Sequence, residues 1–222
     1  MTKKQVADRI VEIGIVPVIR ATSAKQAIYA VEGVCAGGIP VVEITMTVPG
    51  AIELLTSLAR TSASEILIGA GTVLDAEDAR RCVEAGAQFI VSPGFDAETI
   101  EFANRSATLI MSGALTPTEV ITAWKAGSDF IKVFPCGSVG GASYIRALKA
   151  PLPNIPLVPT GGVNLKTAPE LIEAGAAALG IGSELISTSG VQSGDTSEIS
   201  ENARRYVAVV CEARARRDSR AS

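Results

Sequence analysis

One lysine stands inside an apolar segment of this sequence. Lys132 lies in the run Phe130-Ile-Lys-Val133, whereas the other six lysines occupy terminal, helical or loop contexts. Burial disfavours a charged ammonium group, so a lysine in such a run can present a neutral amine, the nucleophile that forms a Schiff base with a carbonyl compound. The alternative is a structural lysine whose stem packs in the core while its ammonium reaches water or an ion-pair partner.

Glu43 is a carboxylate in a comparable position, in the middle of the apolar run Val41–Thr45. Burying an unpaired charge is costly, and an ion pair between Lys132 and Glu43 would offset the cost for both groups. The same carboxylate is suited to move protons to and from a lysine-bound intermediate. The residues alone leave both interpretations open, a structural pair and a catalytic one.

Four further places in the sequence have residue types that bind anions. Glycines in Pro159-Thr-Gly-Gly-Val163 and Gly180-Ile-Gly-Ser183 expose backbone amides that can hold a phosphate, although turns use glycine as well. Arg20, directly after the first apolar run, is either a bidentate ligand for a carboxylate or a plain surface arginine. Gly69-Ala-Gly-Thr72 is either a place where a ligand approaches the backbone or a tight turn.

The composition excludes several classes of function. The 222 residues contain no histidine, which rules out His-based triads and the HExxH zinc motif. The four cysteines are widely spaced without a CxxC pair, so we expect reduced thiols and no metal site. A net charge of −3 offers no basic field for nucleic acid, and no apolar run reaches the roughly 18–20 residues of a membrane span. We therefore expect a soluble cytoplasmic protein without nucleic-acid or membrane partners.

Eight short apolar runs alternate with Ala-, Glu- and Leu-rich stretches long enough for helices, which is typical of βα units around a parallel sheet. The runs are Ile15–Ile19, Val41–Thr45, Ile66–Gly69, Phe89–Val91, Leu109–Met111, Phe130–Val133, Leu157–Pro159 and Ala178–Ile181. The pattern predicts an α/β fold, a single (β/α)₈ TIM barrel domain over residues 1–222. An extra N-terminal helix at Lys3–Ile13 would cover the barrel bottom, and Glu198–Arg217 would be the last helix. A doubly wound open sheet is the alternative, but no GxGxxG turn follows the first run.

The sequence resembles the class I aldolases that cleave 2-keto-3-deoxy-6-phosphogluconate (KDPG) and 4-hydroxy-2-oxoglutarate (KHG). Seven motifs in the family's order carry the resemblance over nearly the whole chain: Val16–Arg20, Val42–Pro49, Ile68–Val73, Ile90–Pro93, Thr116–Glu119, Ile131–Pro135 and Val158–Gly162. The resemblance implies cleavage of KDPG to pyruvate and glyceraldehyde 3-phosphate, of KHG to pyruvate and glyoxylate, or of both.

The resemblance also assigns roles to individual residues. It implies that Lys132 forms the Schiff base with pyruvate and that Glu43 moves the protons. The substrate-binding residues that it implies are Arg20 and Thr72 near the pyruvyl carboxylate and substrate oxygens, Thr160, Gly161, Gly162 and Ser183 near the far end or its phosphate, and Pro93 and Phe134 along the pocket wall. It further implies no metal or other cofactor, small keto acids such as pyruvate and a phosphorylated sugar acid as partners, and a homotrimer.

Two positions depart from the family's pattern. Thr47 stands where some relatives carry an arginine, so one anionic contact must come from elsewhere or be missing, and the substrate preference stays open. Ser112-Gly113 replaces a common Pro-Gly pair, which predicts a looser loop at the barrel mouth. Two other functions remain as alternatives, a phosphosugar isomerase or epimerase on the same barrel and a catalytically silent oligomeric scaffold. Neither requires a covalent adduct on Lys132.

Overall fold

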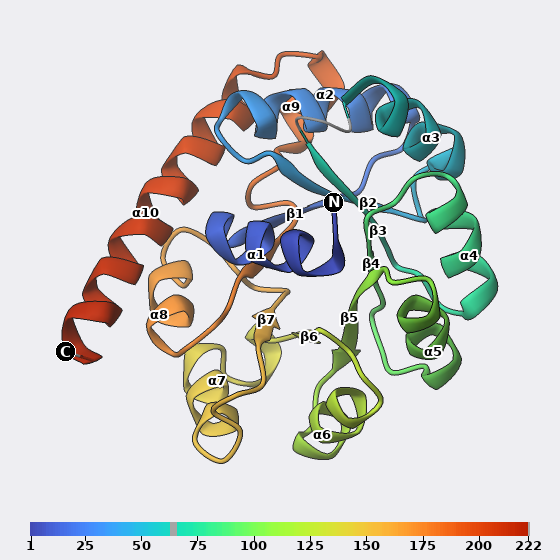
Figure 1. The fold of residues 1–222 in the computed structure, drawn as a ribbon. Helices are drawn as coiled ribbons and strands as arrows, with labels where there is room; N and C mark the ends of the chain where they lie inside the picture. Colours follow the sequence, from blue (N-terminus) through green and yellow to red (C-terminus); the bar gives the residue numbers. More distant parts are fainter. Residues whose placement is uncertain (63–65, 222) are drawn as a thin grey trace.

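The computed structural model describes residues 1–62 and 66–221, and in this part of the chain eight strands form one parallel sheet that curls into a barrel (Figure 1). The sheet order is β7-β6-β5-β4-β3-β2-β1-β8, and a bridge between Thr160 and Gly180 joins its two edges. The strands are β1 Ile15–Ile19, β2 Val41–Thr45, β3 Leu67–Gly71, β4 Phe89–Val91, β5 Leu109–Ala114, β6 Phe130–Val133, β7 Leu157–Pro159 and β8 Leu179–Ile181.

Helices surround the barrel, and their order alternates with the strands (Figure 1). They are α1 Lys3–Ile13, α2 Ala24–Ala36, α3 Ala51–Ser62, α4 Ala76–Glu84, α5 Ala97–Arg105, α6 Pro117–Lys125, α7 Ala142–Lys149, α8 Ala168–Glu173, α9 Thr188–Ser193 and α10 Ser197–Ala221, with a short 3-10 helix at Gly137–Val139. The predicted (β/α)₈ barrel is therefore confirmed. Residues 63–65 and 222 of the predicted domain lie outside the described residues.

Three strands differ in their bounds from the sequence prediction, since β3 begins at Leu67 and β8 at Leu179, each one residue later than predicted, and two strands end later. β3 continues to Gly71, and β5 continues to Ala114, so that Ser112 and Gly113 belong to the strand. The expected loosening of a loop at Ser112 is wrong, because this residue is fully buried and its amide donates to the Ser128 hydroxyl at 2.9 Å. A proline at this position would have no N–H for that bond. The hydrogen bond of Ser112 to Ser128 thus connects β5 to the residues just before β6.

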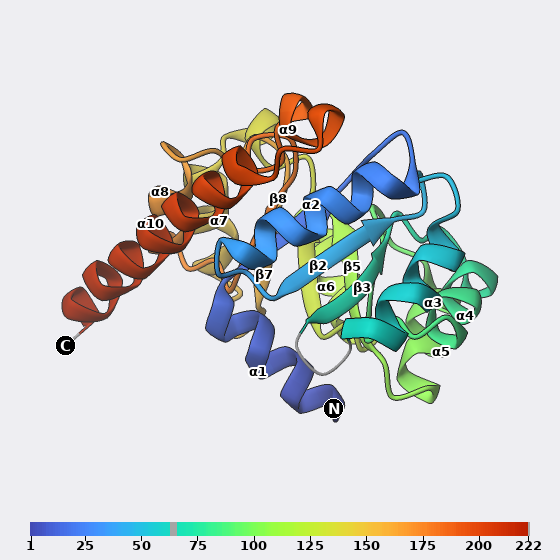
Figure 2. The ribbon, with the colours of Figure 1, turned by 90° about the horizontal axis from the view of Figure 1, so that it is seen from above.

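Helix α1 closes one end of the barrel (Figure 2). Val6 and Ile10 are buried in an apolar cluster with barrel-interior side chains such as Val41, Phe89 and Phe130. This cluster fills the N-terminal end of the barrel and leaves the opposite end for polar side chains.

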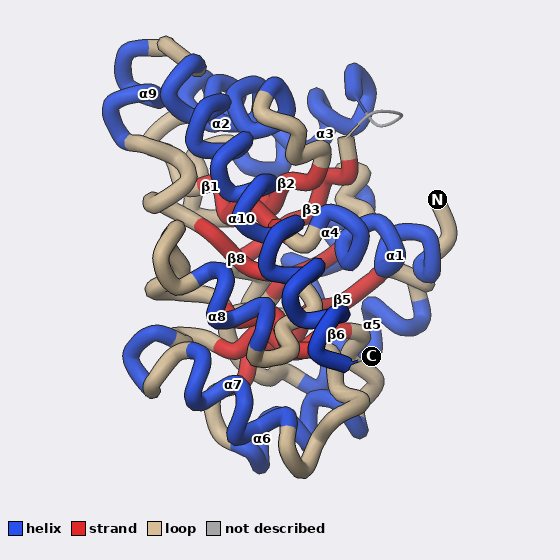
Figure 3. The backbone as a smooth tube through the Cα atoms, turned by 90° about the vertical axis from the view of Figure 1, so that its left-hand side faces the viewer, coloured by secondary structure: helices blue, strands red, loops and turns tan. Residues whose placement is uncertain are grey.

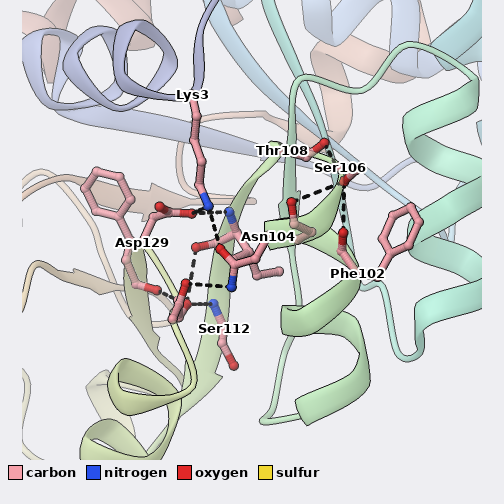
Figure 4. A network of polar contacts seen from close by, with 12 residues as sticks. Lys3, Phe102, Asn104, Ser106, Thr108, Ser112 and Asp129 are labelled. Carbon is pink, nitrogen blue, oxygen red and sulfur yellow. Dashed lines mark hydrogen bonds and ion pairs between the residues drawn. The ribbon is translucent and has the colours of Figure 1, made fainter.

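A polar network fastens the start of α1 to the barrel (Figure 4). The ammonium of Lys3 lies 3.0 Å from a carboxylate oxygen of Asp129 and donates to the Asn104 amide oxygen at 2.8 Å. Asp129 also accepts the Ile110 amide of β5 at 2.8 Å. The network therefore connects α1 to α5 and to the β5–β6 edge at the closed end.

Helix α10 runs along the outside of the barrel against α8 and α2, while α9 lies at the end opposite α1 (Figure 3). Arg214 of α10 donates to the carbonyl oxygens of Val11 and Glu12, at the end of α1. The described residues contain no helix that is both long and apolar enough to cross a membrane.

Candidate active site

The structure brings Lys132 and Glu43 together inside the barrel. Lys132 comes from β6 and Glu43 from β2, and the distance from the Lys132 Nζ to the Glu43 Oε1 is 3.6 Å. Their side chains are 5% and 2% exposed, so the pair is shielded from bulk solvent. The separation is that of an ion pair rather than of a short hydrogen bond.

One oxygen of the Glu43 carboxylate is unsatisfied. Oε1 is buried and has no hydrogen-bond donor among the described residues. A buried carboxylate oxygen without a donor is costly in a purely structural pair. Because this oxygen is the one directed at Lys132, it is placed to exchange a proton with the amine or with a group attached to it.

One glycine of β3, Gly71, makes room for Glu43. Glu43 pairs in register with Gly69, and Thr45 pairs with Gly71. A Cβ atom at Gly71 would lie 1.8 Å from Glu43 Oε1, a distance that real contacts do not reach. The sequence interpretation of Gly69–Thr72 as a ligand-approach loop or turn therefore missed the function of Gly71, which is to leave space for the carboxylate.

Two phenylalanines, Phe130 and Phe134, flank Lys132 along the chain. The Phe134 ring centroid lies 5.7 Å from the ammonium nitrogen, within the range of a cation–π contact. Two residues before Lys132 on the same strand face, Phe130 belongs to the apolar cluster over α1. Lys132 therefore follows the apolar cluster at the closed end of the barrel and lies nearer the open end.

An inner cavity opens at the C-terminal ends of β1, β7 and β8. Among its lining residues are six of the predicted site residues, namely Arg20, Phe134, Thr160, Gly161, Gly162 and Ser183. Gly161 and Gly162 have φ angles of 84° and 77°, which favour glycine. Neither Gly162 nor Ser183 uses its amide in a hydrogen bond with another described residue, so these two N–H groups can serve an anion.

Pro93 and Thr72 lie apart from that inner cavity. Pro93 shares a second cavity with Phe134, on the β4–β6 side of the mouth. Thr72 directly follows β3 and has a φ of 57°, a left-handed conformation that a β-branched residue rarely adopts. Strained backbone of this kind persists only where the surrounding structure fixes it, and it is common at functional sites.

The titratable groups near the mouth include few nucleophiles. Burial raises the pKa of the Cys136 thiol to about 11, so this thiol stays protonated at neutral pH. Burial, followed by the charge of Glu119, raises the pKa of Tyr144, whose hydroxyl donates to the Leu115 carbonyl. The described residues contain no group of three His, Cys, Asp or Glu side chains that could hold a metal ion. The amine and the carboxylate thus remain the groups suited to covalent and proton-transfer chemistry.

The sequence reasoning left several mouth residues unassigned. Gln26, Thr188 and Gln192 line an outer cavity beside Arg20, together with Thr47, which the sequence had marked only as a departure. Gln26 and Thr188 are recognisable in the sequence at most as residues near helix starts, so no sequence signal points to a binding role.

Comparisons with known proteins agree with this geometry. The profile of the KDPG and KHG aldolase family matches residues 6–202. The chain is 34% identical to the 2-dehydro-3-deoxy-6-phosphogalactonate aldolase of Escherichia coli (strain K12) over 175 residues, which are 78% of this chain and 85% of that relative.

Two solved structures have the same fold as this chain. The KDPG aldolase of Legionella pneumophila, with pyruvate captured as a covalent carbinolamine, has a TM-score of 0.83 and 30% identity and covers 90% of this chain and 97% of its own. A cube-shaped protein cage designed by fusing symmetric oligomeric domains has a TM-score of 0.85 and 29% identity, covering 94% of this chain and 76% of its own.

Proposed function

Because this chain belongs to the KDPG and KHG aldolase family, we propose that it cleaves KDPG, KHG or both through a Schiff base on Lys132. The observation that carries the proposal is the buried pair of Lys132 and Glu43, with its unsatisfied carboxylate oxygen. The carbinolamine captured in the Legionella pneumophila relative supports the same covalent chemistry.

The first steps form the covalent intermediate. Transfer of a proton from the Lys132 ammonium to Glu43 leaves a neutral amine, which attacks the C2 carbonyl of the substrate. Glu43 returns the proton to the carbinolamine oxygen and then carries a second proton from the carbinolamine nitrogen to the same oxygen, which leaves as water and yields an iminium. The Lys132 Nζ and the Glu43 Oε1 lie 3.6 Å apart, so the proton has a short path between the two groups.

Bond cleavage uses the iminium as an electron sink. Glu43 removes the proton of the C4 hydroxyl, the C3–C4 bond breaks toward the iminium, and the C4 fragment leaves as an aldehyde. The resulting enamine takes the proton from Glu43 at C3, and hydrolysis of the new iminium releases pyruvate and restores Lys132. Each proton removed in the cycle is returned, and no oxidant or reductant is needed.

The other predicted residues would position the substrate. We assign Thr72 to the pyruvyl carboxylate and Arg20 to oxygens further along the chain, since Arg20 shares its cavity with Gly162 and Ser183. The free amides of Gly162 and Ser183 would bind the far end of the substrate or its phosphate. Thr160 and Gly161 shape this end of the pocket, and Pro93 and Phe134 would form the opposite wall.

We also propose that residues 1–222 act as one domain, that the protein is a cytoplasmic homotrimer, and that its partners are small keto acids. The four cysteines of the chain are free, which fits a reducing compartment. The symmetric oligomeric domains named for the designed cage support self-association.

Borohydride trapping tests the mechanism. Incubation with pyruvate and sodium borohydride should add one reduced pyruvyl group, which peptide mapping places on Lys132. Lys132→Arg keeps the charge but has no reactive amine, so it should remain unlabelled. A folded wild-type protein that gains no mass would contradict the Schiff base and favour an isomerase, an epimerase or a silent scaffold.

A further inference from the structure

Gly113 of β5 leaves a space beside Lys132 inside the barrel. The two residues pair across β5 and β6. Gly113 comes two positions after Met111, and Lys132 two positions after Phe130, and both of these apolar residues belong to the cluster that fills the barrel interior. Because side chains alternate between the two faces of a strand, the space at Gly113 lies in the interior as well, on the strand next to Lys132.

The carbonyl group of Pro93 fills this space. A Cβ atom at Gly113 would lie 2.1 Å from the Pro93 carbonyl carbon and 2.2 Å from the carbonyl oxygen, distances that real contacts do not reach. Pro93 follows β4 by two residues, so the loop after β4 bends over β5. Backbone of this loop thus stands where a side chain of β5 would otherwise lie, next to Lys132.

Ser92 fastens the same loop to β5. Its hydroxyl donates to the Gly94 carbonyl at 2.6 Å and accepts the Gly113 amide at 3.3 Å. Ser92 is buried, so bulk water does not compete for either bond. One partner follows Pro93 in the loop and the other lies beneath it in β5, so the two bonds together fix the position of the Pro93 carbonyl.

The Pro93 carbonyl and the inner cavity lie on opposite sides of the reacting pair. Lys132 on β6 and Glu43 on β2 approach each other across the barrel, which leaves β3 to β5 on one side and β7, β8 and β1 on the other. On the second side, a Cβ atom at Gly182 would meet no atom closer than 3.4 Å, and Gly182 lines the inner cavity. A substrate in that cavity therefore approaches Lys132 from the side away from Pro93.

We propose that Ser92 is a positioning residue for the reaction. By holding the Pro93 carbonyl over Gly113, it gives the group attached to Lys132 a fixed wall on the side away from the inner cavity. Glu43 must reach C3 of the bound pyruvyl group in each cycle, and a fixed wall removes orientations of this group in which C3 misses the carboxylate. Ser92 acts through Pro93 and touches no reacting atom. The inference rests on the proposed aldolase function and deepens it.

Exchange of pyruvate protons in D2O isolates this step. Pyruvate bound to Lys132 as an iminium loses a C3 proton to Glu43, the enamine takes a deuteron at C3, and hydrolysis releases deuterated pyruvate. Loss of the methyl signal in the proton NMR spectrum of pyruvate measures the rate. No aldehyde takes part, so the result does not depend on which substrate the enzyme cleaves.

Two substitutions displace the Pro93 carbonyl by different means. Ser92→Ala removes both hydroxyl bonds, and Gly113→Ala places a Cβ atom where the carbonyl lies. We expect each to lower the exchange rate at saturating pyruvate by roughly tenfold, a smaller loss than the roughly 100-fold that a catalytic group displaced by about 1 Å can cause. The half-saturating pyruvate concentration should stay within about threefold, because the Lys132 amine that captures pyruvate is unchanged. Borohydride labelling of Lys132 should persist for the same reason.

Ser128→Ala is the matched control. The Ser128 hydroxyl has the same pattern of bonds, since it donates to the Phe130 carbonyl at 2.7 Å and accepts the Ser112 amide at 2.9 Å, and Ser128 is buried as well. It lies just before β6, toward the closed end of the barrel. We expect its Tm to fall as that of Ser92→Ala does, while its exchange rate stays within about twofold of the wild type.

Two outcomes overturn the inference. One is a folded Ser92→Ala or Gly113→Ala protein that exchanges pyruvate at the wild-type rate. The other is a Ser128→Ala protein slowed as much as Ser92→Ala, which would show a general loss of rigidity. Wild-type protein that neither exchanges pyruvate nor is labelled by borohydride would contradict the proposed function, on which the inference rests. Labelled wild type with unchanged exchange in the variants would refute only the role of Ser92.

Discussion

Position 71 is a glycine, and the space that it leaves determines where the Glu43 carboxylate can lie. Gly71→Ala tests this directly. A Cβ atom there would lie 1.8 Å from the Glu43 Oε1, 2.4 Å from Cδ and 2.5 Å from Cγ. Cβ contacts shorter than 3.0 Å essentially never occur, so Oε1 must withdraw by about 1.2 Å. Misplacement of a catalytic group by about 1 Å can cost roughly 100-fold in rate, and we expect a loss of that order in kcat.

The assay is release of pyruvate from KDPG, with borohydride trapping as a second readout. Because Gly71→Ala displaces Glu43 and leaves the Lys132 amine in place, labelling of Lys132 by pyruvate should survive, although more slowly. Gly94→Ala is the control, since a Cβ atom at Gly94 meets nothing within 4 Å. A folded Gly71→Ala enzyme with the kcat of the wild type would refute the role assigned to this glycine and to the position of Glu43.

Two further predictions concern stability. Lys3→Met removes the contacts to Asp129 and Asn104 and should lower the free energy of unfolding by about 1 kcal/mol, which corresponds to a fall in Tm of about 2–4 °C. Lys4→Met is the control and should change the Tm little, because the pair of Lys4 with Asp8 is exposed. Equal Tm shifts for both variants would contradict the role of the network. Burial raises the pKa of Cys82 from 9.0 to about 12, and burial followed by the charge of Glu184 raises that of Tyr206 from 10.0 to about 12. Their stabilising contribution is complete below pH 9 and is lost as the pH rises toward 12, so urea unfolding should show stability falling over that range and falling less steeply for Tyr206→Phe.

The barrel could be predicted from sequence because its strands are buried on both faces. Such strands appear as continuous apolar runs, and five of the eight predicted runs, such as Val41–Thr45, have the boundaries found in the structure. Two of the other three runs were predicted to end early, at Gly69 and Met111, because the segments that follow, Ala70-Gly71 and Ser112-Gly113, contain glycine and serine, which composition assigns to turns. Pairing with neighbouring strands carries them further, since Gly71 pairs with Val91 and Ser112 with Ile131.

The reacting pair could also be predicted from the sequence, whereas the residues that hold it in position could not. A charged residue inside an apolar run can be recognised from the sequence of a single strand, and Lys132 and Glu43 each lie in such a run. The role of Gly71 depends on the register between β2 and β3, which places it against the Glu43 carboxylate. Relations across the fold of this kind leave no pattern in a single sequence.

The distribution of charge at the mouth constrains how a substrate with two anionic ends can bind. Thr47 is neutral, and its hydroxyl donates a hydrogen bond to the Thr45 hydroxyl, because that hydroxyl itself donates to the Ile19 carbonyl. Position 47 therefore offers no positive contact. Arg20 is the one cation lining the inner and outer cavities. A keto acid with a second terminal oxyanion must therefore bind one of its two anionic groups through backbone amides, such as those of Gly162 and Ser183, and through hydroxyls. Because neutral donors bind anions more weakly than a guanidinium does, the affinity of this site should depend on which end of the substrate reaches Arg20. Preference between phosphorylated and carboxylate-terminated substrates then follows from the side chains around that arginine rather than from the strand residues that carry out the bond cleavage.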